Sequence, residues 1–261
     1  MESMYQCYAD VDRDCCSLWG SKGMDMTFQI GLVGSDGLII ASDETAVREG
    51  GLRADGKCSM RVSSGVEKIF VAKKNNLICA FAGDSIVTNF ASELIQSVSS
   101  GDDLSEDLAL KNRATEVYEA HHSVEIRKRT SGQMMVAIPG VLKLWEFLFM
   151  GGEVILQAVS NRSFCGDRCN PAVYFAERYL PLDSLKYPVE RLKLIAAHTI
   201  LEGSALNPTS VGGLSILICM TGEQPRFLEP DELQELRTHS QKLHDMIAVT
   251  LLPAVGPLFP K

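Results

Sequence analysis

Residues 27–43 read TFQIGLVGSDGLIIASD and carry the strongest structural signal in the chain. Two apolar runs of strand-forming residues, 27–33 and 38–42, flank the segment Gly34-Ser-Asp-Gly37. A short segment with glycine and aspartate between two such runs is typical of a tight turn. We therefore expect residues 27–43 to form a β-hairpin of two apolar strands.

The rest of the chain is organised in blocks of strands and blocks of helices. A second hairpin is expected over residues 66–83, after a polar stretch, 48–65, that indicates a loop or a flexible hairpin tip. Strands and helices in separate blocks favour stacked antiparallel sheets with helices packed outside, rather than an alternating βαβ sheet. The elements expected after the second hairpin are helices 84–98 and 105–127, strands 134–138, 141–150 and 154–159, helices 171–179 and 188–201, a strand 213–220 and a helix from 230.

The composition places the chain among globular proteins. Of its 261 residues, 46% are hydrophobic and 22% are charged, which excludes a mostly disordered or collagen-like chain. A net charge of −8 is the opposite of the basic footprint of a nucleic-acid binder. No segment has the ~20 apolar residues of a membrane helix, and the N-terminus lacks the basic and apolar regions of a signal peptide. We expect a cytoplasmic protein that binds neither nucleic acid nor membrane.

We expect neither a cofactor nor a metal site. No Gly-x-Gly-x-x-Gly follows a strand, and the chain has no P-loop sequence for nucleotide phosphates. The eight cysteines are scattered, and Cys165 and Cys169 lack the second pair or nearby histidine that would complete a zinc set. His121 and His122 are adjacent on an expected helix, so they point about 100° apart. We interpret them as part of a solvated helix face.

Thr27 is the main candidate for chemistry. It begins the first strand, and Met26 directly precedes it. Translation from Met26 and removal of that methionine would leave Thr27 at the N-terminus. An α-amino group has a pKa of about 7.7–8.0, so it can act as the base for the hydroxyl of its own threonine. Most strand threonines are structural, so this interpretation depends on the residues around Thr27.

Several residues recur at defined distances from Thr27. Gly37 follows it by ten residues and Asp43 by sixteen, Lys68 opens the second hairpin, and an Ala-Gly pair ending at Gly83 precedes the first long helix. In this spacing the sequence resembles the proteasome β-type family of N-terminal nucleophile hydrolases, and in particular a bacterial proteasome-like peptidase subunit. The resemblance implies an α+β fold, a four-layer αββα sandwich of two antiparallel sheets flanked by helices.

The resemblance also implies a role for each of these residues. Thr27 Oγ would attack the scissile carbonyl, and the α-amino group of the same residue would take the proton. Lys68 would lower the hydroxyl pKa by its positive charge, and Asp43 would hold Lys68 in place. The backbone N–H of Gly83 would donate to the oxyanion. Two further segments of the family support the amine, and the residues in their place here are Asp167 and Ser210.

The sequence therefore predicts a threonine-type peptidase subunit of a proteasome-like ring, acting on peptides or unfolded proteins. A homo-oligomeric ring and an ATPase unfoldase as candidate partner follow from the resemblance. Residues 1–26 would be a leader or disordered extension, and 27–261 one proteasome β-like domain with a C-terminal helix and an apolar tail. Two alternatives stay open: a catalytically inactive proteasome-like scaffold, with Lys68 and Asp43 an ordinary ion pair, and an N-terminal nucleophile amidohydrolase on a small amide.

Overall fold

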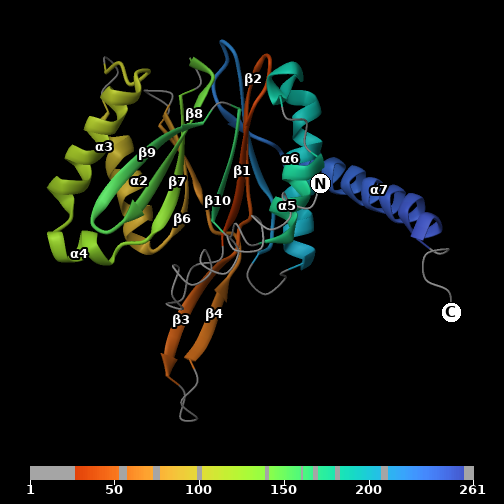
Figure 1. Cartoon of the computed structure of the whole chain (residues 1–261), viewed down its shortest axis with the longest axis horizontal. Coiled ribbons are helices and arrows are strands. Elements are labelled where there is room, and N and C mark those ends of the chain that lie inside the picture. The colour runs from red at the N-terminus through yellow and green to blue at the C-terminus, as the bar shows by residue number, and fades with distance from the viewer. Residues whose placement is uncertain are drawn as a thin grey trace, which may run out of the picture.

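Two five-stranded antiparallel sheets lie face to face, with helices on the outer face of each (Figure 1). The predicted α+β class and its four-layer αββα sandwich are confirmed. The predicted leader, residues 1–26, lies outside the described residues. The computed structural model describes residues 27–52, 58–72, 77–98, 102–138, 141–159, 161–166, 170–179, 183–206 and 211–255.

The first sheet contains the hairpin expected from residues 27–43. Its strands run in the order β10–β1–β2–β11–β12. β1 (Phe28–Val33) and β2 (Gly37–Ser42) are buried along their whole length, because one face meets the second sheet and the other meets helices. This double cover explains why both strands are continuous apolar runs rather than alternating ones. The other strands are β10 (Arg162–Gly166), β11 (Ser215–Met220) and β12 (Arg226–Phe227).

The second sheet is a meander in which each strand pairs antiparallel with the next. Phe147 of β8 faces Met134 of β7 across the ladder, and Trp145 faces Val136. These side chains make one face of the sheet apolar, and that face supports helices. The strands are β5 (Ile69–Ala72), β6 (Leu77–Gly83), β7 (Gly132–Ile138), β8 (Lys143–Met150) and β9 (Glu153–Val159).

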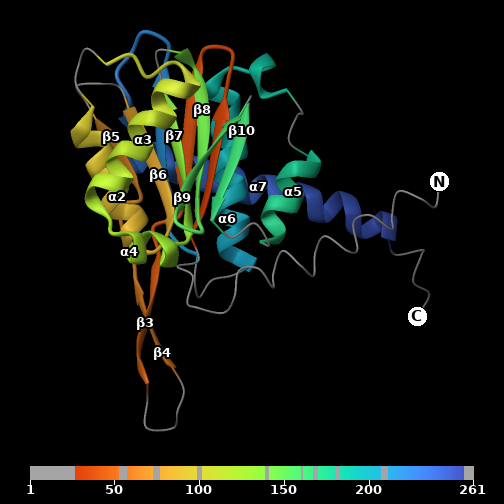
Figure 2. The same cartoon turned by 60° about the vertical axis from the view of Figure 1, so that its left-hand side comes forward.

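Helices α2 (Ser85–Ser97) and α3 (Asp107–His121) cover the outer face of the second sheet (Figure 2). The prediction of one helix over 105–127 is wrong. The backbone turns extended at His122, and the Ser123 side chain accepts the N–H of Ile126 at 3.4 Å. A serine that binds a backbone N–H three residues on starts a helix, so a separate α4 (Val124–Arg129) follows.

The first sheet has its own helical layer. α5 (Pro171–Tyr179) and α6 (Val189–Leu206) pack on its outer face, with the short 3₁₀ helix η2 (Ser184–Lys186) between them in sequence. α7 (Pro230–Val255) contacts α6 and then extends away from the sheets (Figures 1 and 2). Across the described part of the chain, no helix combines the length and apolarity needed to cross a membrane.

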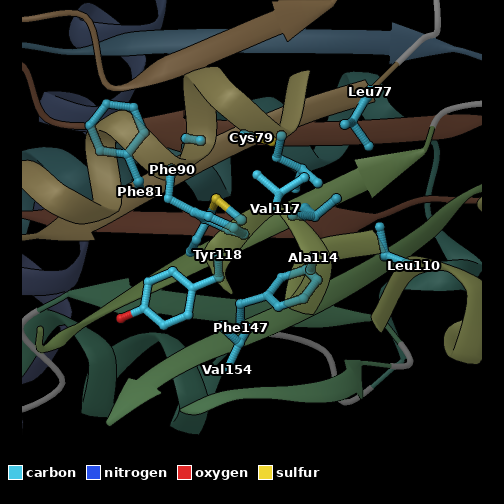
Figure 3. Packing of buried hydrophobic residues seen from close by; sticks show 14 of the residues in the cluster. Leu77, Cys79, Phe81, Phe90, Leu110, Ala114, Val117, Tyr118, Phe147 and Val154 are labelled. Carbon is cyan, nitrogen blue, oxygen red and sulfur yellow. The ribbon is translucent and has the colours of Figure 1, made fainter. Parts of the chain in front are cut away.

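Three apolar clusters fill the spaces between the four layers. The cluster between the second sheet and its helices is rich in aromatic rings (Figure 3). Phe90 of α2, Tyr118 of α3 and Phe149 of β8 meet edge to face, with ring centroids 5.1 to 5.5 Å apart. Edge-to-face rings contribute beyond the area that they bury. This cluster therefore anchors α2, whose N-terminus follows Gly83.

Two parts of the fold differ from the sequence-based expectation. Residues 46–63 form a two-stranded ribbon, β3 (Ala46–Leu52) and β4 (Cys58–Ser63), where a loop or a flexible hairpin tip was expected. The ribbon pairs with neither sheet and stands out from the body (Figure 1). β10 was not predicted, because its five residues show little apolar pattern. It becomes a strand by pairing with β1, far away in the sequence.

Candidate active site

Four of the predicted site residues meet at one edge of the two sheets. Thr27 directly precedes β1 and Asp43 directly follows β2. Because these strands are antiparallel, the two residues are neighbours, and the N–H of Asp43 donates to the carbonyl of Phe28 at 3.1 Å. In the second sheet, Lys68 directly precedes β5 and Gly83 ends β6, the antiparallel partner of β5.

The Lys68 ammonium joins the two sheets at this edge. Its Nζ lies 3.0 Å from Asp43 Oδ1 and 2.9 Å from Asp43 Oδ2, and it also donates to the carbonyl oxygen of Thr45. The Asp43 carboxylate accepts two backbone N–H groups as well, from Phe28 at 2.8 Å and from Thr45 at 3.1 Å. Asp43 thus binds Lys68 and the residue next to Thr27 at the same time.

This ion pair lies inside the protein. The side chain of Asp43 is 0% exposed and that of Lys68 is 4% exposed, which a sequence cannot show. Burial raises the pKa of the Asp43 carboxyl, and the Lys68 ammonium and the two N–H groups act against that rise. Taking two charges out of water costs several kcal/mol per ion. The buried pair is stabilised by hydrogen bonds with the N–H groups of Phe28 and Thr45 and with the carbonyl of Thr45.

Thr27 itself is tightly enclosed. It is 3% exposed, and the end of β10 lies against its backbone. A Cβ added at Gly166 would lie 1.8 Å from the carbonyl oxygen of Thr27 and 3.4 Å from the Cβ of Ala82. Gly166 therefore lies between Thr27 on the first sheet and the residue before Gly83 on the second sheet. Only a glycine at position 166 allows the end of β10 to lie this close to the backbone of Thr27 within the first sheet.

Gly83 is also a glycine for a steric reason. Its φ of +137° is a backbone conformation that residues with a side chain rarely adopt. An added Cβ would lie 2.7 Å from the Cα of Gly132 and 2.8 Å from the carbonyl oxygen of Ser131. The next residue, Asp84, caps α2 by accepting the N–H of Ile86 at 2.9 Å. The backbone at Gly83 is therefore fixed between β7 and the start of a helix.

The two remaining predicted residues, Asp167 and Ser210, lie outside the described residues. The glycine pair that follows Ser210 does reach the site, because Gly212 accepts the N–H of Glu44 at 2.7 Å. A Cβ at Gly213 would lie 2.6 Å from the Glu44 carboxylate. The segment after Ser210 thus lies beside Asp43.

Two backbone groups at the site could not be predicted from sequence patterns. The backbone carbonyl of Thr45 binds Lys68, and the backbone N–H of Phe28 binds Asp43. Every residue except proline carries a backbone N–H and every residue a carbonyl, so a motif does not identify which ones are used. The position of Phe28 directly after Thr27 was the only available signal.

The adjacent histidines are only partly on a solvated face. His122 is 8% exposed, which corrects the expectation for this residue, and its Nε2 lies 3.2 Å from Glu93 Oε2 of α2. His121 is half-exposed, as expected. The break between α3 and α4 turns His122 inward. Among the residues that the structure describes, no group of three or more His, Cys, Asp or Glu is placed to hold a metal ion.

The buried ion pair yields a stability prediction. Lys68→Met should lower the free energy of unfolding by about 3–5 kcal/mol, because it leaves a buried carboxylate without its cation. The double variant Asp43→Asn/Lys68→Met should be more stable than Lys68→Met alone. Lys186→Met removes the lysine of an exposed ion pair. This variant should change the free energy of unfolding by less than about 0.5 kcal/mol. Urea unfolding checks all three, and equal small losses for both lysines would contradict the structural role.

A second prediction concerns Gly166. Gly166→Ala should destabilise the protein strongly, because the new Cβ overlaps the carbonyl of Thr27 and the backbone must shift. Gly222→Ala is the matched control, since Gly222 also has a positive φ of +81° but nothing lies within 4 Å of an added Cβ. The control should cost only about 1–2 kcal/mol of conformational strain. Thermal unfolding measures the difference, and equal losses would show that Gly166 is not in contact with Thr27.

Comparisons with known proteins bear on the fold. No protein-family model and no curated protein matches this sequence. A solved structure of Anbu, the (Gly-1) mutant from Hyphomicrobium sp. strain MC1, is similar with a TM-score of 0.57 over 85% of this chain and 96% of that chain, at 12% sequence identity. At this identity the likeness concerns the fold alone. The chain shares the fold of that structure, with two antiparallel sheets flanked by helices.

Proposed function

We propose that the chain is a threonine-type peptidase subunit with Thr27 as its N-terminal nucleophile. One observation carries the proposal: Thr27 directly precedes β1, and the backbone N–H of the next residue, Phe28, binds the carboxylate of the buried Lys68–Asp43 pair. Gly166 lies between Thr27 and the residue before Gly83, at the end of β6. A buried lysine held by three oxygens, with its carboxylate bound to the residue that follows Thr27, is more than a stable fold requires. Replacing a buried ion pair by well-packed apolar residues is often neutral or stabilising, so a function for the charge is the better explanation.

The proposed reaction uses groups that this geometry provides. With residue 27 at the N-terminus, its α-amino group takes the proton from Oγ, and Oγ attacks the carbonyl carbon of the peptide bond. Lys68 stabilises negative charge on Oγ, and Asp43 keeps Lys68 in place. The N–H of Gly83 donates to the oxyanion, an interaction whose loss typically costs ~10²–10³ in rate. The protonated amine then gives its proton to the leaving amine, and water hydrolyses the ester.

A catalytically inactive scaffold is the competing function. The sequence places 26 residues before Thr27, and if they stay attached, its amine is an amide that cannot take a proton. A small-amide hydrolase would use the same nucleophile. Substrate size therefore separates the two enzymes, and the state of the Thr27 amine separates both from the scaffold.

The first functional prediction concerns this amine. Protein produced so that it begins at Thr27 should react covalently with a peptide epoxyketone and should cleave peptide amides, because both its amine and its hydroxyl are free. Thr27→Ala should lose reaction and cleavage while keeping its unfolding curve. Intact-mass spectrometry measures the adduct.

The control is the chain that still carries residues 1–26, which should not react. Lys68→Arg keeps a cation at the same place, so it should retain more reactivity than Lys68→Met. If the Thr27→Ala variant reacts as fast as the unsubstituted protein that begins at Thr27, Thr27 is not the nucleophile. No reaction of protein beginning at Thr27 would favour the scaffold.

The second functional prediction concerns assembly. We propose a homo-oligomeric ring, in which packing between subunits confines the nucleophile, with an ATPase unfoldase as candidate partner. The far half of α7 exposes Met246 and Val249 at 66% and 70%, and apolar surface of this kind marks contact sites. Light scattering should show a closed oligomer for the full chain and a smaller species without residues 247–261. A strictly monomeric full chain would contradict the ring and leave the small-amide hydrolase as the better enzyme.

A further inference from the structure

Two buried glutamines cross the apolar layer between the sheets. Gln133 of β7 is 4% exposed and Gln29 of β1 is 0% exposed. Around them, the layer between the sheets is formed by apolar side chains from both sheets. A buried amide costs free energy unless its hydrogen bonds are made. Each of these side chains forms a hydrogen bond with the opposite sheet. Both bonds lie at the edge that contains the candidate active site.

Gln133 reaches from the second sheet to the first. Its Oε1 accepts the backbone N–H of Gly166, with a distance of 2.8 Å between the two heavy atoms. Gly166 pairs with Phe28 in the first sheet, and it lies against the carbonyl of Thr27. Within its own sheet, Gln133 pairs with Ala82 of β6, the residue before Gly83. One side chain of β7 therefore connects the backbone beside Thr27 to the strand that pairs with β6 next to Gly83.

Gln29 reaches in the opposite direction. Its Nε2 donates to the backbone carbonyl of Lys68 at 3.3 Å and to Ser42 Oγ at 3.1 Å. Gln29 lies two residues after Thr27, and Ser42 directly precedes Asp43. The Lys68 carbonyl also accepts the N–H of Phe81 at 3.2 Å, which ties it to the second sheet. Gln29 therefore fixes the backbone that carries the lysine relative to the strand that carries the threonine.

We propose that Gln133 and Gln29 are positioning residues that set the separation of Thr27 from Gly83 and Lys68. Thr27 belongs to one sheet, and the other two belong to the second. Apolar side chains press sheets together but do not fix how one slides over the other, because dispersion contacts are not directional. Hydrogen bonds have a preferred length and angle. The catalytic consequence rests on the proposed function, whereas the two bridges do not.

The experiment compares Gln133→Leu with Gln133→Glu in protein that begins at Thr27. Leucine removes the acceptor for the Gly166 N–H, and glutamate keeps one. Exchange of the Gly166 amide with solvent deuterium, followed by NMR, should be at least about tenfold faster in Gln133→Leu, as expected for loss of a bond of ~1.4 kcal/mol or more. The maximal rate of reaction with a peptide epoxyketone should fall by up to ~10², the usual effect of a small misplacement, with little change in inhibitor binding. In Gln133→Glu, the Gly166 exchange rate and the maximal reaction rate should both stay close to those of the unsubstituted protein.

Ser184→Ala is the matched control. Ser184 Oγ donates to the carbonyl of Val33 at 2.6 Å, so this variant removes a buried hydrogen bond at the opposite end of β1. It should lower stability without changing Gly166 exchange or the maximal reaction rate. Gln29→Leu should accelerate exchange in residues 66–72 and slow the reaction in the same way.

Each outcome decides a separate point. Unchanged Gly166 exchange in Gln133→Leu would show that the bridge does not exist. Faster exchange with an unchanged maximal reaction rate would overturn positioning. Equal rate losses in Gln133→Leu and Ser184→Ala would show that the slower reaction follows from lower stability alone. This result too would overturn the positioning role. If unsubstituted protein that begins at Thr27 does not react at all, the proposed function fails, and the exchange data then reduce the glutamines to structural bridges.

Discussion

The buried contact between Asp43 and Lys68 is the constraint on which the site depends. It joins the end of β2 in one sheet to the start of β5 in the other. Two charges without water are tolerated only where hydrogen bonds replace their hydration, and here the N–H groups of Phe28 and Thr45 and the carbonyl of Thr45 do so. The backbone next to Thr27 is therefore held by the same carboxylate that holds the lysine.

Neighbouring strands approach so closely at this edge that side chains are excluded at two positions. Gly166 has no room for one against Thr27 in the first sheet, and Gly83 has none against its ladder partner Gly132 in the second. The glutamines Gln29 and Gln133 then connect the two sheets and fix their relative position through directional bonds. Apolar packing supplies most of the stability of such a sandwich, but it does not by itself place one atom against another. Polar contacts perform that task at the edge where the proposed nucleophile lies.

The regular elements could be predicted where local sequence and final environment agree. β1 and β2 are continuous apolar runs around a turn, and burial on both faces matches that pattern. The prediction failed where the secondary structure depends on pairing with another strand or on a local side-chain hydrogen bond. β10 has little apolar signal and is a strand because β1 pairs with it. The break at His122 follows from a capping serine, and the ribbon of residues 46–63 forms by pairing with itself.

The sequence by itself determined the hairpin, the separate blocks of strands and helices, and the spacing that brings Thr27, Asp43, Lys68 and Gly83 to strand ends. Strand ends of antiparallel neighbours meet, so Thr27 could be expected near Asp43, and Lys68 near Gly83. Only the tertiary structure decided that the ion pair is fully buried and that the Thr45 carbonyl and the Phe28 N–H complete it. It also decided that Gln133 reaches Gly166. The physical reason is that burial and backbone hydrogen bonding depend on how two sheets stack, and periodicity along one chain carries no information on that distance.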